Sequence, residues 1–172
     1  KIHKSKNLLT LVKLWQKSKF LKKFYLNIYG EIDDKKYFSV INEFILRNNN
    51  IHYLGHFSKK IQQKLSKYDV FIHPSKSENF GLVIYEALSS GLFLILNKNL
   101  KKTDLEKDYF AMNINFNLES LNNSIKKILQ NKKKIKSLAY KKKCFNYIKT
   151  NFNWETISKF YLDEYLIVIN NK

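Results

Sequence analysis

Short apolar segments alternate strictly with helical segments along the first two thirds of this chain. A strand such as Leu92 to Leu96, apolar at every position, is typical of a parallel sheet that is buried on both faces. The periodicity predicts strands over residues 24–29, 51–54, 69–73, 92–96 and 111–116, and helices over 7–17, 37–45, 61–68 and 80–90. This alternation predicts an α/β fold, a Rossmann-like three-layer domain with a parallel sheet flanked by helices.

After residue 117 the apolar spacing is helical to the end of the chain, and no linker separates this part from the residues before it. Three helices are expected, over residues 118–130, 133–150 and 153–169. The length of 172 residues suits one domain. A composition of 44% hydrophobic and 27% charged residues favours a folded chain. No linker rich in Pro, Gly or Ser is present, so residues 1–172 are predicted to form a single domain.

The net charge and the residue composition limit the classes of possible partner but do not identify one. The 32 Lys and Arg residues against 14 Asp and Glu give a net charge of +18, which attracts nucleotide phosphates, nucleic acids and acidic lipids alike. The single cysteine, Cys144, cannot form a disulfide framework, and the histidines lack metal-ligand spacing, so no metal is expected. No apolar run approaches the ~20 residues that span a bilayer, so a cytoplasmic location with at most peripheral membrane contact is expected.

The segment from His73 to Gly91, HPSKSENFGLVIYEALSSG, carries the chemistry. A strand there leads through a loop into a helix, whose free amides and positive dipole end can hold a phosphate. Gly81 allows a ligand to approach the backbone. Carboxylates accept two hydroxyl hydrogen bonds, so Glu86 could hold a ribose and Glu78 a sugar hydroxyl. From the residues alone an alternative stays open, in which Glu78 caps the helix and Glu86 pairs with a surface lysine.

Two stretches resemble family 4 glycosyltransferases. The segment SENFGLVIYEALSSG resembles their E-x7-E signature, written E-G-F-G-L-x-x-x-E-A-x-A-x-G. The opening from Lys1 to Leu8 resembles the R-x-x-x-x-K-G-x start of the family's donor-binding domain, in which the Arg and Lys grip a diphosphate. Lys1 stands at the Arg position, Lys6 at the Lys position and Asn7 at the Gly position. The matching positions of the signature are Glu78, Phe80, Gly81, Leu82, Glu86, Ala87 and Gly91.

The resemblance implies the C-terminal half of a GT-B fold, the half that binds a nucleotide-diphosphate sugar. It implies transfer with retention of configuration and without a bound metal. Lys6 and Glu78 are then the catalytic candidates, with Lys6 stabilising the leaving phosphate and Glu78 orienting the donor sugar. The implied donor-binding residues are Lys1, Lys6, Gly30, His56, Glu78, Asn79, Phe80, Gly81, Leu82, Val83 and Glu86. A glycan or lipid-linked acceptor would bind the N-terminal domain, which this chain lacks, so the chain alone is expected not to transfer efficiently.

Two other interpretations belong to different classes. One is a non-catalytic basic module that binds nucleic acid through lysines and stacked aromatic rings. It requires exposed aromatics clustered among lysines, whereas the aromatics here fall at apolar positions, so no nucleic-acid partner is expected. The other is a GT-B sugar-nucleotide epimerase. The resemblance favours a surface-glycan transferase, such as one for lipopolysaccharide or capsule, which could touch the inner face of the membrane through lysine-rich residues 126–143.

Overall fold

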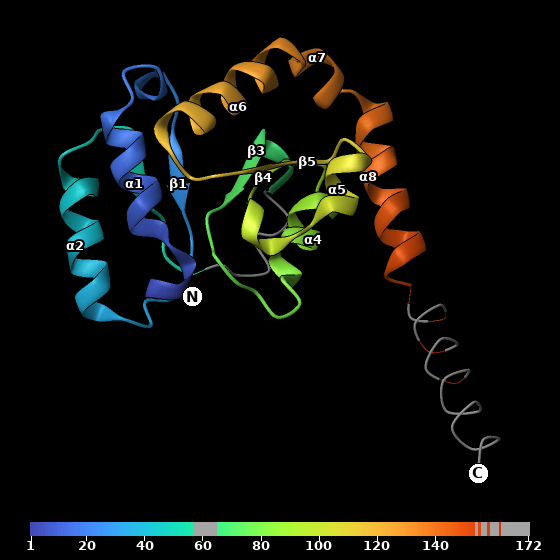
Figure 1. Cartoon of the computed structure of the whole chain (residues 1–172), viewed down its shortest axis with the longest axis horizontal. Helices are drawn as coiled ribbons and strands as arrows, with labels where there is room; N and C mark the ends of the chain where they lie inside the picture. The colour runs from blue at the N-terminus through green and yellow to red at the C-terminus, as the bar shows by residue number, and fades with distance from the viewer. Residues whose placement is uncertain (57–64, 154, 156–157, 159–161, 163–172) are drawn as a thin grey trace.

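The computed structural model describes residues 1–56, 65–153, 155, 158 and 162. Its strands form two parallel sheets with helices packed around them, which confirms the predicted Rossmann-like α/β fold (Figure 1). Strand β1 (Leu26–Ile28) pairs with β2 (Ile51–Tyr53), and the central strand β4 (Phe93–Asn97) pairs with both β3 (Val70–His73) and β5 (Ala111–Ile114). The carboxyl ends of paired strands therefore fall at the same edge of each sheet.

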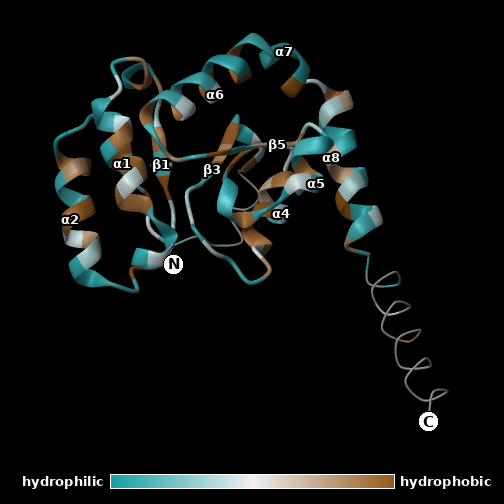
Figure 2. Ribbon diagram, viewed as in Figure 1, coloured by the Kyte–Doolittle hydropathy of each residue, from teal (hydrophilic) through white to brown (hydrophobic). Residues whose placement is uncertain are grey.

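The β1–β2 pair packs with two amphipathic helices. Helix α1 (Leu8–Lys17) buries Leu11, Val12 and Trp15, and helix α2 (Lys35–Leu46) buries Tyr37 and Ile41. The Asp34 side chain caps α2 by accepting a hydrogen bond from the Tyr37 amide. The apolar spacing therefore sets which face of each helix turns inward, and Figure 2 shows hydrophobic residues, in brown, along both helices.

The second sheet is enclosed by the remaining helices. Every residue of β4 is buried, as expected for a strand covered on both faces. The helices are α4 (Leu82–Ser89), α5 (Thr103–Lys107), α6 (Leu118–Gln130), α7 (Lys132–Ile135) and α8 (Leu138–Asn151). Short 3-10 helices, η1 (Lys4–Lys6), η2 (Leu21–Lys23), η3 (Leu65–Lys67) and η4 (Lys98–Leu100), fill several connections.

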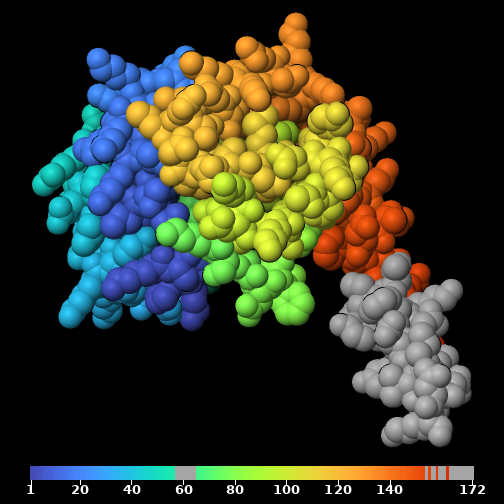
Figure 3. Space-filling model, in the orientation of Figure 1, coloured from blue at the N-terminus to red at the C-terminus, as the bar shows by residue number. Residues whose placement is uncertain are grey.

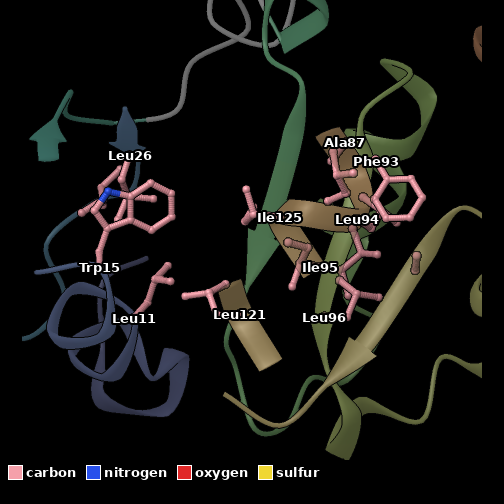
Figure 4. Close-up of a cluster of buried hydrophobic side chains, with 14 of the residues drawn as sticks. Leu11, Trp15, Leu26, Ala87, Phe93, Leu94, Ile95, Leu96, Leu121 and Ile125 are labelled. Carbon is pink, nitrogen blue, oxygen red and sulfur yellow. The ribbon is translucent and has the colours of Figure 1, made fainter. Parts of the chain in front are cut away.

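One hydrophobic core joins the two sheets. Leu121 and Ile125 of α6 lie between Trp15 of α1 on one side and Ile95 of β4 on the other (Figure 4). The Ser18 hydroxyl at the end of α1 also donates a hydrogen bond of 2.7 Å to the Asn122 side chain of α6. Helix α6 therefore ties the β1–β2 half to the β3–β4–β5 half and fixes how their strand ends meet.

Two predicted boundaries were wrong. The helix expected over residues 133–150 is two helices, α7 and α8, because Ser137 adopts an extended conformation and caps α8 through its side chain. The helix expected over 80–90 begins only at Leu82, since Gly81 adopts a left-handed conformation that ends the preceding loop. Residues 98–100 and 103–107, for which no element was predicted, form η4 and α5.

Two further predictions fall wholly or partly on residues that are not described. Of the helix expected over 61–68, residues 61–64 lie outside the described part, and η3 occupies residues 65–67. Most of the helix expected over 153–169 also lies outside it. Within the described residues, no helix has the length and apolar character needed to cross a membrane.

Candidate functional site

The loop that follows β3 is clamped against the N-terminal segment. The Asn7 side chain at the end of η1 and the Asn97 side chain at the end of β4 both donate hydrogen bonds to the Pro74 carbonyl, at 3.2 and 3.1 Å. The buried Ser75 hydroxyl lies 2.8 Å from the Ser77 carbonyl and 3.2 Å from the Ser5 carbonyl. Figure 3 shows the two segments side by side, the N-terminal one in dark blue and the loop in green. These contacts fix the loop from three directions.

Asn7 has a second role in placing the N-terminal segment. Its backbone is left-handed, with φ 54° and ψ 26°, and it ends η1 and begins α1. Few residues other than Gly adopt this conformation at low cost, and Asn is one of them. Asn7 therefore preserves the backbone that a glycine would supply at this position, and it adds a side chain that holds Pro74.

The clamp brings two distant charged residues into contact. Lys6 Nζ lies 2.6 Å from Glu78 Oε1, although the residues are 72 positions apart in the chain. His73 Nε2, at the end of β3, lies 2.8 Å from the same oxygen. The Lys6 and Glu78 side chains are 32% and 12% exposed, so this ion pair is partly shielded from water. Two of the predicted site residues, Lys6 and Glu78, are thus adjacent.

The electrostatics of this cluster keep the carboxylate ionised. Burial opposes the charge on Glu78, but the hydrogen bonds from Lys6 and His73 outweigh it and hold the pKa of the carboxyl below its ordinary value. Burial also lowers the pKa of His73, more than the neighbouring carboxylate raises it. This lowered pKa favours the neutral form of the His73 ring. An ionised carboxylate only accepts hydrogen bonds, so the hydrogen of the His73 ring is on Nε2.

Gly81 sets the entrance to helix α4. Its backbone is left-handed, with φ 67°, and a Cβ there would lie 3.1 Å from Ile84 Cδ1. Among the described residues no side chain caps α4, and the Ile84 amide donates to the Gly81 carbonyl, so the first-turn amides left for a ligand are those of Leu82 and Val83. A helix start of this kind attracts anions, and α4 begins four residues after Glu78.

Gly30 and Lys1 meet at the carboxyl end of β1. The Gly30 amide donates to the Gly55 carbonyl at 2.9 Å, and a Cβ on Gly30 would lie 3.2 Å from Ile2 Cγ1. Lys1 Nζ pairs with Asp33 at 3.2 Å and takes no part in the Glu78 cluster. The predicted residue His56, next to Gly55, is exposed.

The other predicted residues surround the start of α4. Asn79, Phe80 and Leu82 are exposed, with Phe80 78% accessible despite its apolar ring. Val83 and Glu86 are half-buried within α4. Among the described residues, no hydrogen bond or ion pair joins Glu86 to Glu78 or Lys6. Glu86 is therefore near the cluster in sequence but is not part of it.

His73 and Asn97 were not among the predicted site residues. The histidines lack metal-ligand spacing, which gave His73 no predicted role, yet it directly precedes Pro74 and contacts Glu78. The available signal was its place as the last residue of a strand that leads into the motif. The signal for Asn97 was weaker, because a single asparagine after an apolar strand is common in loops and caps that have no functional role. No group of three or more His, Cys, Asp or Glu side chains suited to a metal ion is found in the described part of the chain.

Comparison with known proteins identifies the family. The model of the family described as glycosyl transferases group 1 matches residues 1–144, more than four fifths of the chain. The chain belongs to this family. No curated protein matches it.

Solved structures share the fold. HepE from Anabaena in complex with UDP gives a TM-score of 0.75 at 21% identity, over 98% of this chain and 47% of that one. Sucrose-phosphate synthase from Thermosynechococcus elongatus gives 0.73 at 20% identity, over 99% and 44%. WaaG, a glycosyltransferase involved in lipopolysaccharide biosynthesis, gives 0.65 at 19% identity, over 86% and 40%. The chain thus spans less than half the length of these three proteins.

Proposed function

We propose that this chain is the donor-binding half of a retaining glycosyltransferase and binds a nucleotide-diphosphate sugar beside β3 and α4. The observation that carries the proposal is the 2.6 Å contact between Lys6 and Glu78. It joins the basic N-terminal motif to the E-x7-E motif at a helix start whose amides are open. A cation, a carboxylate and free amides in one place suit a ligand with a diphosphate and hydroxyl groups.

The proposed roles follow from charge. The diphosphate binds Lys6 and the first amides of α4, at Gly81, Leu82 and Val83, and these groups stabilise the negative charge that grows on the leaving phosphate. Glu78 accepts hydrogen bonds from the donor sugar and orients it, and Glu86 accepts those of the ribose. Lys1 adds positive charge from the end of β1. Gly30, His56, Asn79 and Phe80 complete the proposed lining.

Binding and transfer are separate in this proposal. Catalysis requires donor and acceptor to be held in one geometry, and a glycan or lipid-linked acceptor would bind a second domain. HepE, whose fold over 47% of its chain is shared by this one, has been solved with UDP-glucose, which supports a nucleotide sugar as the ligand class. The isolated chain would therefore bind the donor and transfer poorly.

Calorimetric titration with UDP, GDP, ADP and CDP tests the proposal. One of the four should bind best, and Lys6→Ala should weaken it about 10- to 150-fold, as expected for the loss of a charged hydrogen bond of ~1.5–3 kcal/mol. Glu86→Ala should also weaken it. EDTA should change nothing, since no metal is required in the proposed mode.

Two matched controls isolate the site from the overall charge. Lys4→Ala removes the same charge from an exposed position of the same turn, and Glu119→Ala removes an exposed carboxylate from α6. Neither should change the affinity more than about twofold, since exposed charges contribute little. Equal weakening by Lys4→Ala and Lys6→Ala, with no preference among bases, would mean that net charge alone binds polyanions.

The proposal extends to a surface-glycan pathway at the cytoplasmic face of the membrane. WaaG, a structural neighbour, acts in lipopolysaccharide biosynthesis, and exposed lysines of α7 and α8 offer a basic surface to anionic lipid. These lysines are Lys132, Lys133, Lys134, Lys141, Lys142 and Lys143. Sedimentation with phosphatidylglycerol vesicles but not with phosphatidylcholine vesicles would support the membrane contact. Equal sedimentation with both would contradict it.

A further inference from the structure

His73 is built into the fold more firmly than Lys6, which contacts the same oxygen of Glu78. It is the last residue of β3, and its backbone is in register with Leu96 of the fully buried strand β4. Its side chain is 11% exposed, and its ring stacks on Phe71 with centroids 5.6 Å apart and planes 16° from parallel. The position of Nε2 is therefore fixed by the sheet and by the neighbouring ring.

Lys6 is held less firmly and has a second candidate partner. Its side chain is 32% exposed, and it extends from a three-residue 3-10 turn. A lysine ammonium is a compact charge on a flexible stem, so it can turn from Glu78 towards an arriving phosphate. The carboxylate would then lose one of the two donors that now share Oε1.

We infer that His73 is a positioning residue, whose Nε2–H holds the Glu78 carboxylate in place while Lys6 binds the diphosphate and the second carboxylate oxygen receives a hydroxyl of the donor sugar. The inference rests on the proposed function. A neutral imidazole suits this role, because it donates a hydrogen bond without adding a charge that would compete for the phosphate. Direct contact with the sugar is assigned to Glu78, not to His73.

The consequence is a selective effect on the sugar part of the ligand. Without His73, Glu78 keeps only the side-chain hydrogen bond from Ser75 when Lys6 leaves it, so the carboxylate is held less firmly and its hydrogen bond to the sugar weakens. The diphosphate contacts, made by Lys6 and the α4 amides, remain. Loss of a hydrogen-bond donor at His73 should therefore weaken binding of a nucleotide sugar while leaving the free nucleotide almost unaffected.

The test compares two ligands on three proteins. Calorimetry with the best-binding nucleoside diphosphate and with its glucose ester is carried out on the wild-type chain, His73→Phe and His73→Gln. His73→Phe keeps an aromatic ring against Phe71 but has no donor, whereas His73→Gln restores an N–H group. We expect His73→Phe to weaken the glucose ester about 10-fold and the diphosphate less than twofold, and His73→Gln to recover most of the loss.

The outcomes separate this inference from the function on which it rests. Equal weakening of both ligands by His73→Phe, or no weakening of either, overturns the positioning role while leaving donor binding intact. The same holds if His73→Gln, with unchanged unfolding by urea, fails to recover any of the loss. Absence of binding by any of the four diphosphates to the wild-type chain overturns both.

Discussion

The contact between Lys6 and Glu78 should make a measurable contribution to stability. Exposed ion pairs contribute about 0.2–1 kcal/mol, and hydrogen bonds to charged groups about 1.5–3 kcal/mol. At 2.6 Å, with side chains 32% and 12% exposed, this pair falls between those classes. A double-mutant cycle with Lys6→Met and Glu78→Gln should therefore give a coupling energy of about 1–2 kcal/mol. Urea unfolding at pH 7 measures it, provided that the m value stays constant.

A second ion pair of the same chain provides the control. Lys1 and Asp33 lie 3.2 Å apart with side chains 64% and 41% exposed. The cycle with Lys1→Met and Asp33→Asn should give less than about 1 kcal/mol, because solvent screens an exposed pair. If the coupling of Lys6 to Glu78 is no larger than that of Lys1 to Asp33, the Lys6–Glu78 contact does not hold the two motifs together in solution.

Three further predictions concern backbone, core and pH. Gly81→Ala should cost about 1–2 kcal/mol because its φ of 67° disfavours a side chain, and should lower Tm by about 2–8 °C; an unchanged Tm would contradict the left-handed turn. Leu94→Ala, at a fully buried position, should cost about 2–5 kcal/mol by urea unfolding, whereas Leu46→Ala, at a site 78% exposed, should stay within about 0.5 kcal/mol; similar costs would contradict the assigned burial. Because burial lowers the pKa of His73, the unfolded state binds more protons at this residue, and the free energy of unfolding should fall as pH drops below 6.5. The variant His73→Gln should flatten this decline. An equally steep decline in the variant would contradict the assignment of the pH dependence to His73. The lowered pKa of Glu78 adds a loss only below about pH 4.5.

Much of the fold could be predicted from the sequence because apolar strand segments, above all the one that forms β4, alternate with amphipathic helices. The strand expected over 92–96 is β4, displaced by one residue, and the helix expected over 118–130 is α6. Periodicity failed where a single polar residue decides the local conformation. Ser137 interrupts an otherwise helical pattern by capping a new helix, and nothing in the apolar spacing marks that break.

The site was predictable in part, since one motif of fixed spacing carries Glu78, Gly81 and Glu86. The sequence alone did not place Lys6 against Glu78, because that contact spans 72 positions and depends on how the β1 half packs against the β3 half. The resemblance named both residues without showing their contact. The contact of His73 with Glu78 could not be predicted from residue spacing, because it depends on the orientation of the His73 ring at the end of β3.

A basic hollow elsewhere on the surface is an alternative place for an anion. Leu129, Gln130, Asn131, Lys132, Lys133, Lys134 and Lys136 line an open hollow of about 820 Å³ at the junction of α6 and α7. Its lysines would attract a diphosphate through charge alone. None of the described residues that line this hollow carries a carboxylate, and the helix that begins there, α7, has only four residues. Binding in the hollow should therefore not distinguish one base from another.

A crystal structure of the chain with its best-binding nucleoside diphosphate tests the central claim most directly. The account predicts phosphate oxygens within hydrogen-bond distance of Lys6 Nζ and of the first amides of α4. It also predicts that the Glu78 carboxylate keeps its hydrogen bond to His73 Nε2. A diphosphate seated instead on the lysines between Lys132 and Lys136, with the Lys6–Glu78 pair undisturbed, would contradict it.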